Sequence, residues 1–293
     1  MPIKLNENSV EKIPHSCLVR LQATYDSLKS AEKKAADLLL EHPDFFAGAS
    51  IVEAAREAGC SEATLVRLAR RLGYGGYPEL KAHLIEGKKG SPMLYSDITD
   101  EDDYNTILIK VFQASIQALK DTMNLLDREE YKRAVDCLCH AGKIVILGVG
   151  DAAAVARSGY QKFIRAGLNV QMSADLDQQL ITVSHLSKED VVIAVSHSGR
   201  TKSLLDVVKQ AKATGATVIA ITNYPVSPLT KNSDIVLLTA AFAQHMIGEI
   251  MSKRITELCL LESLFINTLK CRPDLVQNIE KSNLALEVNK LKG

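Results

Sequence analysis

The sequence predicts two domains of different fold class: an all-α helix-turn-helix domain, followed by an α/β domain with a doubly wound, parallel, five-stranded sheet. Three observations predict this division. Apolar residues recur at helical spacing from Ser27 to about Glu86, whereas short apolar runs alternate with helical segments from Lys143 onward. Between them, Gly87–Asn105 is rich in Gly, Pro, Ser and acidic residues, which is typical of a linker.

The length and composition agree with two globular domains. The chain has 293 residues, of which 46% are apolar and 24% are charged, and domains average ~150 residues. Its formal net charge is zero, so any nucleic-acid site must be a local basic patch. The expected boundaries are 1–86 for the first domain, 87–126 for a linker and connecting helix, and 127–293 for the second domain.

The sequence also predicts a cytoplasmic protein with no membrane segment. The N-terminal stretch MPIKLNENSVEKIPHS has no apolar core of signal-peptide length, and no stretch reaches the ~18 uninterrupted apolar residues of a membrane span. The six cysteines are scattered without a CxxC pair. We therefore expect reduced, mostly buried thiols, no disulfide framework, no metal and no cofactor.

Two short helices joined by a glycine turn form the centre of the first domain. Ser50 can cap the helix IVEAAREA, and Ser61 can cap the helix EATLVRLARRL. Between them, Ala58-Gly59-Cys60 makes a turn in which glycine permits a left-handed backbone. This arrangement is the helix-turn-helix signature. A small helical domain with solvated arginines is the alternative.

The helix after Ser61 divides into a core face and an exposed face. Four residues are expected to face the core: Leu65, Leu68, Ala69 and Leu72. In this motif the start of the second helix enters the major groove, so four residues are expected to contact base edges there: Glu62, Ala63, Thr64 and Arg67. Ser61, just before this helix, is also an expected DNA contact. Three more are expected to hold phosphates: Arg70, Arg71 and Lys81. The predicted partner is double-stranded operator DNA.

A helical segment over 105–126 follows the linker. Its apolar residues recur near the helical period: Ile107, Leu108, Val111, Phe112, Ile116, Leu119 and Met123. Two roles for this stripe stay open. It joins the two domains, or it is buried against a second copy of the chain.

Five apolar runs in the second half predict parallel strands covered on both faces: 143–150, 169–172, 190–196, 217–223 and 234–239. Ligands of such sheets bind beyond the carboxyl ends of the strands. The turn GVGDAA after the first run argues against a dinucleotide, because the third glycine of GxGxxG is replaced by Ala153 and no acidic residue closes the second strand.

The stretch AVSHSGRTKS, from Ala194 to Ser203, places small hydroxyl residues where a buried strand gives way to a helix. The first N–H groups of a helix lack partners and carry partial positive charge. Four residues are therefore expected to bind a phosphomonoester: Ser196, Ser198, Gly199 and Thr201. A plain cluster of helix caps is the alternative. We expect a structural role for His197, and an Arg200 that either points outward or neutralises charge.

These motifs resemble a known family. A strand ending in a GxG turn, then SHSGRT, then VIAIT resembles the sugar-isomerase (SIS) phosphosugar-binding domain. Preceded by SIVEAAREAGCSEATLVRLARRLGYGGYPELK, the chain resembles an RpiR/MurR-type bacterial transcriptional regulator from about Ser27 to Leu269. The resemblance implies a dimer or tetramer that controls sugar-catabolism genes in response to a sugar phosphate. It places ligand contacts at Ser196, Ser198 and Thr201, and in the turn 148–152.

One departure from the family pattern affects the first turn. The usual GxGxS has Ala152 in place of serine, with Asp151 before it, so one hydroxyl is lost and a carboxylate would repel a phosphate. Gly150 and Asp151 remain candidate ligand contacts, with Asp151 binding sugar hydroxyls or the amine of an unusual ligand. Asp175 and Asp177 either reach sugar hydroxyls or cap the following helix.

Two other functions remain as alternatives. The same fold hosts phosphosugar isomerases, which need a histidine or carboxylate to move a proton, and His245 and Glu249 lie four residues apart. The second domain would otherwise be only a dimerisation scaffold for a DNA-binding protein. A fused DNA-binding module favours sensing, so we do not expect an enzyme.

Overall fold

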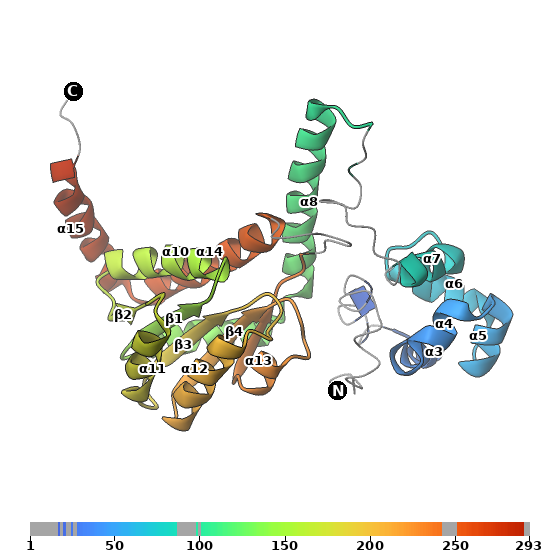
Figure 1. Cartoon of the computed structure of the whole chain (residues 1–293), viewed down its shortest axis with the longest axis horizontal. Helices are drawn as coiled ribbons and strands as arrows, with labels where there is room; N and C mark the ends of the chain where they lie inside the picture. The colour runs from blue at the N-terminus through green and yellow to red at the C-terminus, as the bar shows by residue number, and fades with distance from the viewer. Residues whose placement is uncertain are drawn as a thin grey trace. The chain divides into compact units, whose positions relative to one another are not determined.

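The computed structural model describes residues 28–86, 101–241 and 251–289, together with Cys17, Arg20, Leu21, Tyr25 and Ile98 (Figure 1). It divides into two compact units. One comprises the described residues up to Leu125, and the other comprises 126–241 and 251–289. Within the described part of the chain, no helix combines the length and the apolar character needed to cross a membrane.

The first unit is entirely helical, as predicted. Its helices are α3 (Ser30–Glu41), α4 (Pro43–Gly48), α5 (Ile51–Glu57), α6 (Glu62–Arg71), α7 (Tyr77–Glu86) and α8 (Tyr104–Leu125). The short α4 is not foreseen by the sequence analysis. It begins at Pro43 because proline is tolerated at the first helical position, while α3 has to end before it.

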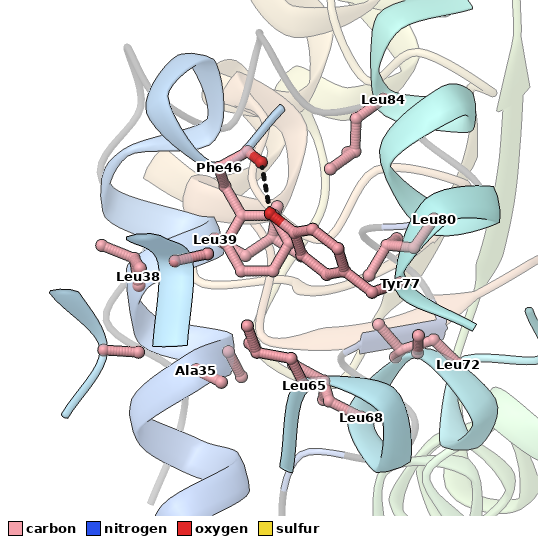
Figure 2. Packing of buried hydrophobic residues seen from close by; sticks show 14 of the residues in the cluster. Ala35, Leu38, Leu39, Phe46, Leu65, Leu68, Leu72, Tyr77, Leu80 and Leu84 are labelled. Carbon is pink, nitrogen blue, oxygen red and sulfur yellow. Dashed lines mark hydrogen bonds between the residues drawn. The ribbon is translucent and has the colours of Figure 1, made fainter. Parts of the chain in front are cut away.

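A single apolar core holds α3 to α7 together (Figure 2). The four residues predicted to face inward from α6 are all buried: Leu65, Leu68, Ala69 and Leu72. Tyr77 is also buried, and its hydroxyl donates to the carbonyl oxygens of Phe46 (3.0 Å) and Ala49 (3.2 Å). This burial raises the pKa of Tyr77 to about 12. The two bonds tie α7 to the end of α4.

The second unit contains the predicted five-stranded, all-parallel sheet. Its strands are β1 (Ile144–Gly148), β2 (Val170–Gln171), β3 (Val191–Val195), β4 (Thr217–Thr222) and β5 (Ile235–Leu238). They lie in the order β2-β1-β3-β4-β5. The pairs Gly148–Val195 and Val195–Ile221 bring the carboxyl ends of the three central strands level with one another.

Helices cover both faces of this sheet, so the sheet is doubly wound (Figure 1). One apolar cluster joins the sheet to α9 (Arg128–His140), α10 (Ala152–Arg165) and α14 (Met251–Cys271). A second cluster on the opposite face includes residues of α11 (Leu176–Ser184), α12 (Lys202–Ala213) and α13 (Pro228–Lys231). The chain then continues through the short turns η1 (Pro273–Leu275) and η2 (Glu287–Asn289), with α15 (Val276–Leu286) between them.

The expectation of reduced cysteines is wrong for one pair. Cys139, near the end of α9, and Cys271, the last residue of α14, form a disulfide with 6.3 Å between their Cα atoms. They are 132 residues apart in the chain, and only the packing of the two helices brings them together. Cys17 remains a free, buried thiol, and burial raises its pKa to about 12.

Candidate functional site

Two strand-to-helix turns lie side by side at the carboxyl edge of the sheet. β1 and β3 are neighbours, but the chain leaves β1 into α10 on one face and β3 into α12 on the other. This is the point at which the strand order reverses, where open α/β sheets bind ligands. The turn 149–151 and the turn 196–201 therefore face the same space.

The β3–α12 turn is held tightly by its own backbone. The N–H of Gly199 donates to the carbonyl and hydroxyl oxygens of buried Ser196, each at 3.2 Å. The N–H of Leu229 donates to the carbonyl of Gly199 at 3.0 Å. Gly199 has φ +62°, and a Cβ there would lie 2.3 Å from Ser227 Oγ. Only glycine fits this position, for conformational and steric reasons.

The same turn presents polar groups at the start of α12. Thr201 is the N-cap residue, and its hydroxyl makes no capping hydrogen bond. Ser198 Oγ accepts from the N–H of Arg200 at 3.2 Å and still has its own proton to donate. The bond from Leu205 N to Thr201 O is the first of the helix, so the amides of 202–204 precede the intrahelical ladder. Such a helix start favours an anion.

The β1–α10 turn shares a left-handed glycine with the β3–α12 turn but carries different side chains. A Cβ on Gly148 would lie 2.4 Å from the carbonyl oxygen of Ala152, and Gly150 has φ +61°. Asp151 is the N-cap residue of α10, is exposed, and makes no capping hydrogen bond with its carboxylate. Ala152 is buried and contributes no hydroxyl. This side of the site offers a carboxylate acceptor.

The structure also places four other positions considered from the sequence. Asp175 caps α11, because its carboxylate accepts from Gln178 N at 2.8 Å, whereas Asp177 is exposed in the first turn of that helix. The ring of His197 lies edge-on to Tyr224, with 5.9 Å between centroids. This supports the structural role expected for His197. Arg200 is exposed, as expected.

The start of α14 adds a buried ion pair that the sequence analysis does not predict. α10 and α14 pack in one register: a Cβ on Gly159 would lie 3.3 Å from Leu261, and Phe163 stacks against Phe265 with 5.3 Å between centroids. When the same pairing of residues is extended by two turns toward the starts of both helices, Arg254 of α14 is level with the start of α10. Arg254 pairs with the fully buried Glu257.

The helix-turn-helix has the predicted caps. Ser50 and Glu53 form a capping box, with Glu53 N donating to Ser50 Oγ (3.3 Å) and Ser50 N donating to Glu53 Oε2 (2.8 Å). Ser61 Oγ accepts from Thr64 N at 3.3 Å. Gly59 between the helices has φ +61°, which explains the glycine of the turn.

The prediction that Thr64 contacts DNA bases is wrong. Thr64 is only 2% exposed. Its hydroxyl lies 2.9 Å from Ser61 Oγ and accepts from Arg67 Nη2 at 2.9 Å. Helical spacing places residue 64 on the same arc as Leu65 and Leu68, so Thr64 fixes the start of α6 from inside.

The other predicted DNA contacts are exposed on α6, namely Ser61, Glu62, Ala63, Arg67, Arg70 and Arg71. Buried Glu32 of α3 lies beneath two of the arginines: its carboxylate is 3.8 Å from Arg67 Nε and 3.7 Å from Arg71 Nε. The ammonium of Lys81 donates to the carbonyls of Gly48 (3.0 Å) and Ala49 (2.8 Å). It therefore has one of three donors left for a phosphate.

Comparisons with known proteins agree with both halves of this architecture. A family model described as a helix-turn-helix domain of the rpiR family matches residues 15–89, and a model described as an SIS domain matches residues 137–267. An uncharacterized HTH-type transcriptional regulator of Thermotoga maritima is 34% identical over 270 residues, which cover 91% of this chain and 96% of that protein. The chain belongs to the RpiR family of HTH-type transcriptional regulators.

Two further similarities are to the regulators HexR and NanR. The HTH-type transcriptional regulator HexR of Escherichia coli is 31% identical over 248 residues, or 84% of this RpiR-family chain and 86% of HexR. The structure of the Vibrio vulnificus NanR protein complexed with ManNAc-6P has a TM-score of 0.62 and 26% identity, and the match covers 94% of this chain and all of that one. The order of domains, the fold class and the family expected from the sequence are confirmed.

Proposed function

We propose that this RpiR-family regulator binds operator DNA as a homodimer and that a sugar phosphate controls this binding, so that genes of carbohydrate catabolism respond to the metabolite. The observation that carries the proposal is the β3–α12 turn. It presents the Ser198 and Thr201 hydroxyls beside the first amides of α12 at the point where the strand order reverses. This combination suits a phosphomonoester.

The two turns suggest how the effector is oriented. The phosphate lies against Ser198, Thr201 and the start of α12, where the donors and the helix dipole favour negative charge. The sugar extends toward the β1–α10 turn, where the free carboxylate of Asp151 accepts hydrogen bonds from sugar hydroxyls. The NanR neighbour, whose structure contains ManNAc-6P, supports this ligand class.

The DNA surface is the exposed side of α6. Glu62, Ala63 and Arg67 are placed to contact base edges, and Arg70, Arg71 and Lys81 are placed for phosphates. In a homodimer the two recognition helices would contact half-sites ~34 Å apart, so the operator should be roughly palindromic. The effector shifts DNA affinity only through its different affinity for the two states, with typical couplings of ~1–3 kcal/mol.

Catalysis is the competing function, and we do not assign it to this chain. The two candidate proton-transfer residues, His245 and Glu249, lie outside the described residues. Isomerase activity is tested by incubating the purified protein with sugar phosphates and following aldose–ketose conversion. Turnover that disappears in Glu249→Gln would overturn the assignment of a purely regulatory role.

A thermal-shift screen tests the effector site. Hexose, amino-sugar and acyl-amino-sugar phosphates should include a ligand that raises the melting temperature, because a ligand that binds only the folded state stabilises it. The double variant Ser198→Ala/Thr201→Ala should lose this shift and the effector response of DNA binding, and should still bind the operator. A normal response in the double variant would place the phosphate elsewhere.

Operator binding is tested with Arg67→Ala. Loss of one good base contact costs ~1–3 kcal/mol of discrimination, so the preference for operator over random DNA should fall by about 10-fold or more. Arg70→Ala serves as the matched control, because loss of a phosphate contact weakens binding to all sequences about equally. An unchanged preference in Arg67→Ala would remove Arg67 from the base contacts.

A further inference from the structure

A buried carboxylate lies beneath the exposed side of α6. Glu32, in the first turn of α3, is only 2% exposed. Its Oε2 accepts from the N–H of Lys29 at 2.9 Å, and its carboxylate lies 3.8 Å from Arg67 Nε and 3.7 Å from Arg71 Nε. A buried carboxylate needs cations or hydrogen bonds to compensate its loss of hydration, and Glu32 has both.

The packing of the first unit fixes the place of this carboxylate. Ala35, which follows Glu32 by one turn of α3, has no exposed surface. It lies in the same apolar core as Leu65 and Leu68 of α6 (Figure 2). The bond from Lys29 N holds the first turn of α3 at its other end. The carboxylate is therefore held at a fixed place relative to the backbone of α6.

Arg67 is held at a second point by its own helix. Its Nη2 donates to Thr64 Oγ1 at 2.9 Å, and Thr64 Oγ1 lies 2.9 Å from Ser61 Oγ. The Arg67 side chain is nevertheless 57% exposed. Its guanidinium is thus tethered through Nε and one N–H of Nη2, while Nη1 and the second N–H of Nη2 remain as donors. Two parallel N–H groups of this kind suit the O6 and N7 atoms of a guanine.

We propose that Glu32 is a positioning residue for DNA recognition and that, together with Thr64, it holds Arg67 in the orientation that contacts a base edge. The inference rests on the proposed function, in which Arg67 contacts operator bases. A mobile arginine loses many rotamers when it binds a base, and one that is already held loses fewer. This preorganisation strengthens the contact. Thr64 then contributes to recognition without touching DNA.

The charge of Glu32 has the opposite effect on DNA of any sequence. A carboxylate beside Arg67 and Arg71 offsets part of their positive charge, which weakens the attraction to phosphates. Glu32 should therefore favour the operator through the orientation of Arg67 and disfavour all DNA through its charge. A residue with only a structural role would change binding to operator and random DNA in the same direction.

Glu32→Gln in the full-length protein separates these two effects. The amide keeps the size of the side chain and an oxygen that accepts from Lys29 N, and it removes the charge that pairs with Arg67. We expect the preference for operator over random DNA to fall by about 3- to 10-fold, the value of immobilising one long side chain. Binding to random DNA should stay equal or rise slightly. Fluorescence anisotropy measures both, with the duplex that wild type selects from a random pool as the operator.

Glu53→Gln is the matched control. Glu53 is the corresponding glutamate of the capping box at α5, where it accepts from Ser50 N at 2.8 Å. Its charge acts on Arg56 and Lys81, so the variant loses the same charge from the same kind of cap. Its preference for operator over random DNA should equal that of wild type. A fall equal to that in Glu32→Gln would assign the effect to charge or capping and overturn the inference.

A double-variant cycle connects Glu32 to Arg67. In an Arg67→Ala background, Glu32→Gln should leave the remaining preference unchanged, because no arginine is left to position. An equal loss in both backgrounds would overturn the inference. Thr64→Val keeps the shape of the side chain and removes the hydroxyl that holds Arg67, so it should also lower the preference. If Glu32→Gln fails to fold, Thr64→Val decides, and a wild-type preference there overturns the inference.

Failure of this inference can be told apart from failure of the proposed function. If Arg67→Ala itself keeps the wild-type preference, Arg67 does not contact bases, and the proposed DNA contact is wrong together with its positioning. If Arg67→Ala loses the preference while Glu32→Gln keeps it, only the positioning role of Glu32 is wrong. Loss in both single variants, without further loss on combining them, supports both conclusions.

Discussion

The two turns at the carboxyl edge of the sheet each contain a left-handed glycine, but their side chains differ in charge and in hydrogen-bonding groups. Both begin with a buried strand, pass through a glycine near φ +60°, and lead into a helix. The β3–α12 turn places hydroxyls at the helix start, at Ser198 and Thr201. The β1–α10 turn places Asp151 and Ala152 there.

This difference indicates that backbone geometry alone does not make a phosphate site. The two helix starts also differ in their backbone, because Ala153 N and Ala154 N already donate to Gly150 O (2.9 Å) and Asp151 O (3.2 Å), whereas the first bond of α12 comes from Leu205 N. The side chains add to this difference in how well each helix start suits an anion. In this chain the hydroxyls favour an ester dianion at α12, and the carboxylate disfavours it at α10. In the proposed binding mode, this asymmetry places the phosphate at α12 and the sugar toward α10.

The largest expected effect is the loss of stability on replacing Gly199 by alanine, compared with the same replacement at Gly150. Gly199→Ala requires a left-handed backbone for alanine and places Cβ 2.3 Å from Ser227 Oγ, so we expect it to lower the free energy of unfolding by about 2–5 kcal/mol. Gly150→Ala has nearly the same φ and no atom within 4 Å of the new Cβ. It should cost only about 1–2 kcal/mol. Urea denaturation measures both, and equal losses would mean that the contact with Ser227 relaxes freely.

Removal of one hydroxyl tests the phosphate side. Thr201→Val keeps the shape of the side chain and removes the donor, so the affinity for the effector should fall by about 10- to 100-fold. Isothermal titration calorimetry measures the change. Thr214→Val, at the other end of α12, is the control and should leave affinity unaltered, although it removes a 2.7 Å bond to Ala211 O. Similar affinities for the two variants would show that α12 does not hold the phosphate.

Restoring the family serine tests the other turn. Ala152→Ser adds a hydroxyl donor at the start of α10, and we expect affinity for the effector to rise by about 3- to 10-fold, the value of one ordinary hydrogen bond. Titration of wild type and variant with the same sugar phosphate measures the gain. No gain would mean that the ligand does not contact the first residue of α10.

The smallest expected effect concerns Asp151. In Asp151→Asn the affinity for a sugar phosphate should fall by about 3-fold, because a neutral amide oxygen is a weaker acceptor for sugar hydroxyls than a carboxylate. The affinity for inorganic phosphate, which has no sugar, should rise slightly because a like charge is removed, and less so at high salt. A higher affinity for both ligands would show that Asp151 only repels the phosphate and does not bind the sugar.

Sequence reasoning predicted the features that depend on neighbours along the chain. The caps at Ser50 and Ser61 and the five strands are confirmed. The hydroxyls of Ser198 and Thr201 lie at the start of α12, and their role in binding a phosphate stays a prediction. The prediction for Thr64 was wrong because this polar residue lies at the edge of the buried face of α6 and is itself buried. The Cys139–Cys271 bond left no local signal, because the two residues are 132 positions apart. Arg254 and Glu257 are three residues apart on α14, a spacing visible in the sequence, but the burial of Glu257 is not.

The amino-acid order by itself determined which segments are helices or strands and which turn carries hydroxyls, because apolar period, caps and glycines act over a few residues. Only the tertiary structure decided that the β1 and β3 turns share one space and that Glu32 lies beneath the arginines of α6. These facts depend on strand order and helix packing between residues far apart in the chain, which local patterns do not encode.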